Sequence, residues 1–478
     1  MLLPIFLPPS GAPATDEAVA HPSGHFTQAL KAIPWRKIQR ALALILIVVV
    51  LGITLLAGGI AVKGNWDWNR VRAYLEARGE KLSLSGLAPP ALPEADNFFA
   101  DPLWEETVAN PDGPVRLDGL FPPLTPEEIA TLKAKFPALT ADLVAGPRQS
   151  VLQKIFLAVR DRTLTKDEAV LLLEITAPGS ALEARLAELA QRPAARYPLN
   201  YEEGPSGKMP AVGHLMRFAH YLLIRARAHL ALGESEKALE ETLLVLRLAR
   251  TVETEPFLIS LLVGMSIDAM ALDLVRVGLT FWPESGVRRI EEALREIHPI
   301  RDLARALRGE RALAGVVMEK IRRSPETLVA GAFAWQETSK KPSLGHVGLG
   351  MLYNALFLSG DQAFHYSAMQ SWIDAVEADP QILGPQVLAG PDNRISRTLD
   401  QPLGSIRHVM SALALAGLQG AFQRVAYMQS RVQQARIACA IRLYVVANGQ
   451  LPATLDALVP DFLEKVPADI IDGRPMTR

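Results

Sequence analysis

The chain has 478 residues, of which 49% are hydrophobic and 21% are charged, and its formal net charge at pH 7 is -1. This balance lacks the basic footprint of a nucleic-acid-binding protein, so we predict no nucleic-acid partner. A single cysteine, Cys439, excludes a disulfide framework and any multi-cysteine zinc or iron–sulfur site within one chain. We predict neither a metal nor a cofactor.

Residues 1–40 are rich in Pro, Gly and Ala and are predicted to form a disordered stub. Residues 41–62, "ALALILIVVVLGITLLAGGIAV", contain no charged side chain. As a helix they would be ~33 Å long, which is enough to cross the hydrocarbon layer of a bilayer. Arg36 and Lys37 precede the segment and "NWDW" follows it, as is typical of a membrane interface. The sequence therefore predicts one transmembrane helix in contact with lipid.

The orientation of this helix depends on what lies on either side of it, because the flanking positive charges are nearly balanced. A Pro-rich stub of 40 residues is typical of a cytoplasmic end, and the much longer remainder is typical of an exported body. We therefore expect a single-pass protein of the cytoplasmic (inner) membrane, with its N-terminus inside and its C-terminal body outside the cytoplasm.

Residues 63–120 are predicted to be a tether, with a short helical stretch followed by a Pro-rich extended strap. Phe98, Phe99 and Trp104 are the side chains expected to hold this strap against the body.

Residues 121–400 have helical periodicity and no convincing alternation of period two, which predicts an all-α body, an irregular multi-helix bundle. Thr125 with Glu128, and Thr165 with Glu168, have the spacing of capping boxes that begin helices.

Residues 212–251 are predicted to form a helical hairpin that turns at Gly233. Its segment "RARAHLALGESEKALEETLLVLRLA" resembles one tetratricopeptide (TPR) unit, although an array needs about three repeats for stability. We therefore expect an antiparallel hairpin inside a larger bundle. A third helix from Pro256 is apolar almost all round and should be central.

Four side chains of this hairpin share one helical face, namely His214, Arg217, Tyr221 and Arg225. They could form a cationic groove for an anionic ligand. The favoured interpretation is a solvated or salt-bridged face, because glutamates occur on the next helix.

Asp268 and Asp273 interrupt the apolar third helix, where burying an unpaired carboxylate costs several kcal/mol. We expect them to pair with an arginine of the preceding hairpin or with Arg276. The alternative is an internal polar site.

Two glycine-containing segments have incomplete phosphate-binding motifs, and Cys439 lies on an apolar helical stripe. "GPSGKM" (residues 204–209) is predicted to be a surface turn, and "GHVGLG" (residues 345–350) a loop or a close helix contact. Cys439 is predicted to be a core residue and not a nucleophile.

Residues 401–478 are predicted to contain a long helix that stops at Asn448 and Gly449, followed by Pro452. A short helix capped by Thr454 and a turn rich in Pro and Asp should follow.

This tail resembles the C-terminal motif of the type II secretion major pseudopilins. The matching positions are Tyr444, Asn448, Gly449, Pro452, Leu455, Leu458, Val459, Pro460, Pro467, Asp469 and Gly473. Leu451 and Ile470 depart from the motif, and we do not extend the calcium site of that family to Asp469 or Asp472. We expect the tail to be a packing module.

The tail and the hairpin segment "RAHLALG" also resemble a family of large uncharacterised bacterial proteins with a single membrane anchor and a helical body. The resemblance implies no activity. We therefore expect a structural or protein-interaction component of the bacterial envelope, not an enzyme, whose partner could be another envelope or secretion protein. A TPR-like partner-binding module is the alternative, and an envelope hydrolase would require Asp268 and Asp273 to share a cleft.

Overall fold

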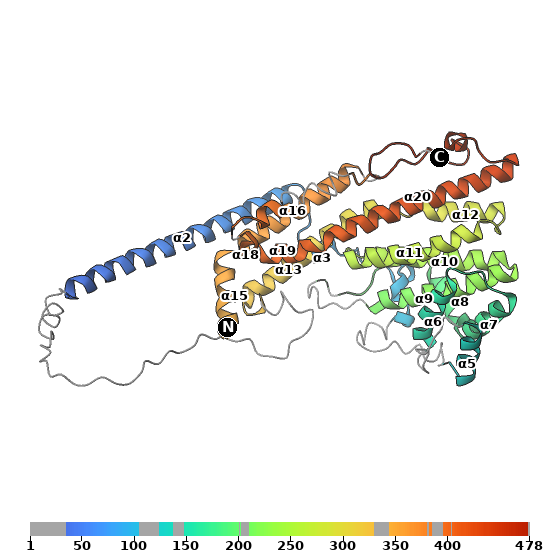
Figure 1. The fold of residues 1–478 in the computed structure, drawn as a ribbon, viewed down its shortest axis with the longest axis horizontal. Helices are drawn as coiled ribbons and strands as arrows, with labels where there is room; N and C mark the ends of the chain where they lie inside the picture. The colour runs from blue at the N-terminus through green and yellow to red at the C-terminus, as the bar shows by residue number, and fades with distance from the viewer. Residues whose placement is uncertain are drawn as a thin grey trace, which may run out of the picture. The chain divides into compact units, whose positions relative to one another are not determined.

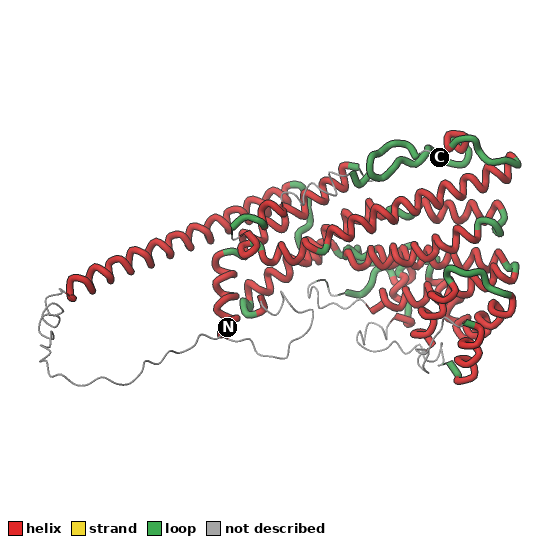
Figure 2. The backbone as a smooth tube through the Cα atoms, in the orientation of Figure 1, coloured by secondary structure: helices red, strands yellow, loops and turns green. Residues whose placement is uncertain are grey.

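A computed structural model describes residues 35–104, 124–136, 148–199, 201, 210–328, 344–379, 382–384, 395–402 and 404–476. The predicted stub lies mostly outside these residues, and "GPSGKM" lies wholly outside them. Residues 1–60 and residues 61–478 form two separate units. Figure 1 shows the helices by label, and Figure 2 shows that helix and loop make up the described backbone.

Helix α2 (Trp35–Ala77) contains the predicted span of residues 41–62, whose large apolar side chains are exposed except for the half-buried Ile60. It is long and apolar enough to be a candidate membrane span. Helix α11 (Leu258–Gly278) satisfies the same criterion, but most of its apolar window is buried inside the protein. A helix that its neighbours already cover is a core helix, so α2 is the better candidate.

The short helix predicted after the span is not separate, because α2 continues unbroken to Ala77. No proline interrupts residues 63–77. The helix ends before Gly79, whose φ of 79° belongs to the left-handed region that glycine adopts most readily.

Where it is described, the predicted strap forms short helical turns in place of the extended chain that we expected. These turns are α3 (Leu84–Leu87), η1 (Glu94–Asp96) and η2 (Phe98–Ala100). Phe98, Phe99 and Trp104 are buried in the main core. The ring centroids of Phe99 and Tyr197 are 5.3 Å apart and those of Trp104 and Phe218 are 6.3 Å apart, so the aromatic side chains hold the strap against the body.

The body begins with four helices: α5 (Pro126–Lys135), α6 (Arg148–Val159), α7 (Lys166–Thr176) and α8 (Ser180–Leu189). A 3₁₀ turn, η4 (Ala177–Gly179), joins the last two. Both predicted capping boxes are confirmed. The side chains of Thr125 and Thr165 each accept a bond from the backbone N–H three residues on, and the glutamate at that position accepts a bond from the backbone N–H of the threonine.

Helices α9 (Pro210–Leu232) and α10 (Ser235–Glu253) form the predicted hairpin. Its turn is at Gly233, which has a φ of 80°. Helix α11 packs against both of them and against two later helices, α13 (Pro299–Arg323) and α20 (Leu418–Asn448). The prediction that the third helix is central is therefore confirmed.

The next helices are α12 (Glu284–Arg295), α13 (Pro299–Arg323), α15 (Leu344–Leu356) and α16 (Leu358–Ala378). The segment "GHVGLG" is therefore helical, and the expectation of a loop was wrong. The alternative of a close helix contact holds at Gly350, where a Cβ atom would overlap the carbonyl of Pro325.

The C-terminal part contains α18 (Gly404–Arg407), α19 (Val409–Ala416), α20 (Leu418–Asn448) and the 3₁₀ turn η6 (Leu455–Leu458). Helix α20 packs along α11, α12 and α13. As predicted, it stops at Asn448, and Gly449 with a φ of 72° is its left-handed cap.

The short helix after Pro452 is only a 3₁₀ turn, and the side chain of Thr454 accepts no capping bond from it. The tail nevertheless packs as expected. Leu458 and Leu463 are buried against Ala440 of α20, and the rings of Tyr444 and Phe462 are 5.6 Å apart. Because the described backbone has only two isolated β-bridges besides helices and loops, the all-α class is confirmed.

Candidate functional site

The four predicted residues of α9 lie on one face of the helix, but they do not form an open cationic groove. His214 and Tyr221 are buried, while Arg217 is exposed and lies 3.3 Å from the Nδ1 atom of His214. Burial, assisted by Arg217, lowers the pKa of His214 to about 4. Burial alone lowers the pKa of the neighbouring His220 to about 4. Both imidazoles are therefore neutral at pH 7.

Arg225 is the charged residue at the centre of this face, and two carboxylates neutralise it. Its Nε atom lies 2.9 Å from Glu183 of α8 and 3.0 Å from Glu241 of α10. Its guanidinium also stacks over Tyr221, 5.6 Å from the ring centre. The salt-bridged interpretation is therefore supported, since the next helix supplies Glu241 as expected.

A cleft of about 320 Å³ lies beside Arg225, between α8 and α10. Its charged lining consists of Glu183, Arg225, Glu240, Glu241 and Arg247. Carboxylates outnumber arginines in this cleft, so it is a poor site for an anionic ligand. The alternative of a cationic groove on α9 therefore has little support here.

Asp268 pairs with an arginine of the preceding hairpin, as predicted. It is fully buried and accepts a bond from Arg250 of α10, which also lies 2.6 Å from Glu253. Gly264 makes room for Glu253, since a Cβ atom there would overlap that side chain. Burial raises the pKa of Asp268 to about 6 and also raises the pKa of Glu253, in both cases against the opposing charge of Arg250. Two buried carboxylates thus share one arginine, whose side chain is 25% exposed.

Asp273 pairs with a residue that the sequence did not indicate. Its Oδ1 atom lies 2.6 Å from Arg431 of α20, and its side chain is 43% exposed. The expected partners, a hairpin arginine or Arg276, were wrong because α20 packs along α11 and brings Arg431 to this position. The structure therefore places Asp268 and Asp273 in different surroundings, on faces of α11 that are roughly 140° apart by helical geometry.

A charged cluster that the sequence did not predict holds the end of α2 to the body. After the turn at Gly79, both carboxylate oxygens of Glu80 are bonded by arginines of α13: Arg308 at 2.8 and 3.0 Å, and Arg311 at 2.7 Å. Arg311 is fully buried. Burial alone would raise the pKa of Glu80, but the bonds and charges of the two arginines outweigh it and lower the pKa to about 2. Glu80 is therefore ionised at every physiological pH.

The same cluster extends to α16. Arg308 makes two bonds of 2.6 and 3.0 Å with Glu377, and Arg78 makes two bonds of 2.8 and 3.0 Å with Asp374. Gln370 joins the two halves, since it bonds both Arg311 and Asp374. We call Arg78, Glu80, Arg308, Arg311, Gln370, Asp374 and Glu377 the anchor clamp. It ties residues 78–80 to two body helices by paired, geometrically specific bonds.

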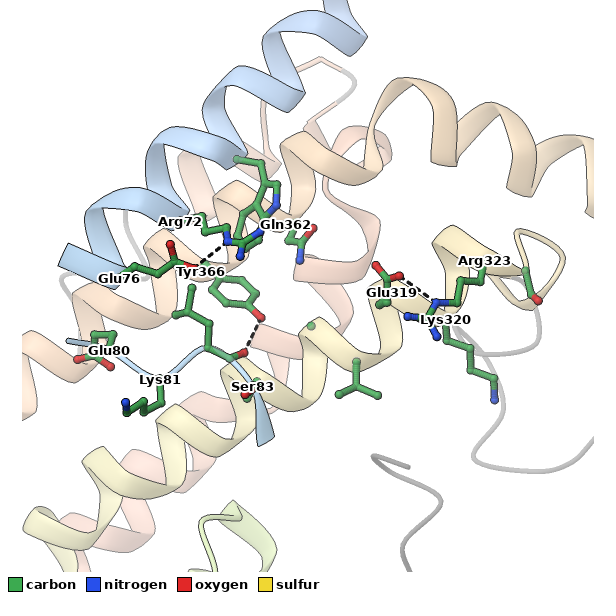
Figure 3. A pocket seen from close by; sticks show the side chains of 16 residues that line it. Arg72, Glu76, Glu80, Lys81, Ser83, Glu319, Lys320, Arg323, Gln362 and Tyr366 are labelled. Atoms are coloured by element: carbon green, nitrogen blue, oxygen red, sulfur yellow. Dashed lines mark hydrogen bonds and ion pairs between the residues drawn. The ribbon is translucent and has the colours of Figure 1, made fainter. Parts of the chain in front are cut away.

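Beside the anchor clamp lies a groove of about 780 Å³ between the end of α2, α13 and α16 (Figure 3). Trp68 and Tyr366 form an edge-to-face pair on one side of it, with their ring centroids 4.9 Å apart. Most charged residues that line the groove are already paired, as Arg72 is with Glu76 at 2.8 Å. Lys81 and Lys320 are exposed in the groove and make no ion pair with any residue that the structure describes. The groove therefore offers aromatic surface and two unpaired cations.

Chemistry that depends on Cys439 or on a metal has no support in the described part of the chain. Cys439 is buried in the main core, and burial raises the pKa of its thiol to about 12. Among the described residues, no group of three or more His, Cys, Asp or Glu side chains is placed to hold a metal ion.

No protein-family model, curated protein or solved structure matches this chain. The resemblances of the tail and the hairpin therefore remain predictions.

The anchor clamp could not have been found from the sequence, although one sign of it was present. Gly79 indicates that α2 ends there, and Glu80 follows it directly. The arginines that bond Glu80 lie 228 and 231 residues further along the chain. Hydrophobic periodicity predicts individual helices and does not predict contacts between residues so far apart.

Proposed function

We propose that the protein is a single-pass inner-membrane protein with an exported helical body, and that the body is a structural or protein-interaction component of the bacterial envelope. The observation that carries this proposal is the anchor clamp. Helix α2 continues for fifteen residues beyond position 62 and is then tied to α13 and α16 by ion pairs. A flexible linker would be enough if α2 only had to hold the body near the membrane, and an ion-paired junction is not a flexible linker.

The groove beside the clamp is the proposed site for a protein partner. Trp68 and Tyr366 offer the aromatic surface that protein interfaces favour. Lys81 and Lys320 favour a segment that carries acidic side chains. The partner that fits is therefore an acidic, partly apolar segment of another envelope protein.

The TPR-like alternative has less support, because the hairpin is enclosed by its neighbours. Helix α10 packs against α9, α11 and α12, and most of its residues are buried. The hydrolase alternative required Asp268 and Asp273 to share a cleft, and each is bonded to a different arginine. Both observations support the structural interpretation.

Cysteine labelling tests the orientation, and buried Cys439 provides an unreactive background. Lys133 is exposed on α5, and Ser23 precedes the span. A membrane-impermeant maleimide should label Lys133→Cys in intact spheroplasts and Ser23→Cys only after lysis. The opposite pattern would overturn the proposed orientation.

Photo-crosslinking tests the groove. A photoreactive amino acid at Lys320 should yield one defined adduct with an envelope protein in intact membranes, and the same amino acid at Lys133 should not. Equal adducts at both positions, or none at Lys320, would contradict the groove as the partner site.

A further inference from the structure

We propose that helix α15 lies in the membrane interface and is a second contact of the protein with the lipid bilayer. This inference rests on the proposed membrane anchoring through α2.

The outward face of α15 is apolar. Residues 344–360 contain no Asp, Glu, Lys or Arg. The exposed fractions of its large side chains are 91% for Leu344, 56% for Leu349, 59% for Met351 and 55% for Leu352. A helix on the surface of a water-soluble protein normally turns charged and polar residues outward. An exposed, contiguous apolar face is typical of a surface that meets lipid or another protein.

The inward face of α15 holds its polar groups and its closest packing. Tyr353 donates a hydrogen bond to the buried carboxylate of Asp361, and the amide of Asn354 donates to the carbonyl of Arg322 at 3.1 Å. Gly350 lies directly against the carbonyl of Pro325. The polar groups of α15 therefore face the protein and its apolar groups face outward, the reverse of a helix that borders water. The hydrogen bonds on the inward face fix this rotation of the helix.

Helix α15 also ends where α2 emerges from the predicted span. A Cβ atom on Gly64 would lie only 3.0 Å from the backbone nitrogen of Gly360. Further along both helices, Arg78 bonds Asp374. In this pair, as in the pair Gly64 and Gly360, the two residues are 296 positions apart in the chain. Because the offset is the same, α16 runs parallel to the emerging part of α2, and its first turn lies level with Gly64. That glycine is only two residues beyond position 62.

Phe357 separates the two helices, and Figure 1 shows α15 turning away from the line of α16. A helix that turns aside at this level is placed to lie across the interface and not to cross the bilayer.

The residues that flank α15 suit the headgroup region. The last turn of α13, which packs against α15, carries Lys320, Arg322 and Arg323. Glu319 pairs with the two arginines, and Lys320 makes no ion pair with a residue that the structure describes. Apolar side chains buried at the acyl boundary, with cations beside them, are the pattern of interfacial helices. A second copy of the chain is the other conceivable occupant of the apolar face. The contact at Gly64 favours lipid, because the same end of this unit already leads into the bilayer.

Spin labelling of the full-length protein tests this assignment. The protein is reconstituted as one copy per lipid nanodisc, and a nitroxide is attached at Leu352→Cys or Met351→Cys. We expect collision with oxygen to exceed collision with a water-soluble nickel chelate at both positions. The resulting depth should be about 5–10 Å below the headgroups.

Leu157→Cys is the matched control, since Leu157 is an exposed leucine of α6 (51%) that should face water. Accessibility to the nickel chelate at positions 351 and 352 equal to that at 157 would overturn the inference. So would low accessibility to both reagents, which would indicate protein contact.

A nitroxide at Ile47→Cys separates the two proposals. Deep lipid exposure at position 47 with water exposure at 352 would remove only the role of α15. Water exposure at both positions would remove the anchor itself.

Discussion

Glu80 is the residue that binds the end of α2 to the rest of the body. Both oxygens of its carboxylate face arginines, and one of these, Arg311, has no access to solvent. Removing one partner of a buried ion pair leaves the other charge unpaired, which costs more than losing an exposed pair.

Substitution Glu80→Gln should lower the free energy of unfolding by about 3–5 kcal/mol, because Arg311 then stays buried without its counter-charge. Glu76→Gln is the control, since Glu76 pairs with Arg72 on the surface and its loss should cost less than about 1 kcal/mol. Denaturant unfolding of both variants in detergent measures the difference. Equal losses would mean that the anchor clamp adds nothing to stability.

The pKa of Asp268 predicts a dependence of stability on pH. Burial raises this pKa from 3.8 to about 6 in the folded protein, so the folded state binds a proton more tightly than the unfolded state. The resulting stabilisation is fully present below about pH 3.8 and is lost as the pH rises through 6.

The free energy of unfolding of the wild type, relative to that of Asp268→Asn, should therefore fall between pH 4 and pH 7. Paired denaturation curves at several pH values measure it. A relative stability that rises over this range would show that the charge of Arg250 dominates the environment of Asp268.

Among individual residues, partners nearby in the chain were predictable and distant ones were not. Thr125 and Thr165 cap their helices with glutamates three positions away, and the spacing alone indicates this. Asp273 and Glu80 are bonded by arginines more than 150 positions further along the chain. Only the packed structure brings such residues together.

At the scale of elements, helix ends followed from glycine and from capping residues. The end of α20 at Asn448 and the turn of the α9–α10 hairpin at Gly233 were predicted, because both glycines adopt a positive φ. The short helix predicted after Thr454 is only a 3₁₀ turn, because a residue type that often caps helices does not ensure that a full helix follows it. The continuation of α2 to Ala77 was missed because the change from apolar to charged composition marks a change of surroundings and not of backbone.

Gly449→Ala should destabilise the C-terminal end of α20 by about 1–2 kcal/mol, since alanine is strained at a φ of 72°. Gly417→Ala is the control, because Gly417 has a φ of -81° and open space around its Cβ position. Hydrogen exchange at residues 440–448 should speed up in the first variant only. Equal exchange in both variants would contradict the capping role of Gly449.

At the scale of the whole molecule, the all-α class and the candidate span were predictable from periodicity and from an uncharged run of residues. The arrangement of the helices was not, since α11, α13 and α20 meet through faces that the sequence marks only as apolar. The charged face predicted on α9 shows the same limit: its residues were placed correctly, and one of its carboxylate partners, Glu183, comes from a helix that the sequence did not indicate.

The central claim is that residues 41–62 hold the protein in a bilayer, and alkaline carbonate extraction of membranes tests it most directly. The full-length protein should remain in the membrane pellet. A variant with Ile47→Lys and Leu51→Lys should shift toward the supernatant, because each charge at the centre of a membrane helix costs about 2.5–3.5 kcal/mol. Release of the unmodified protein into the supernatant would contradict the claim.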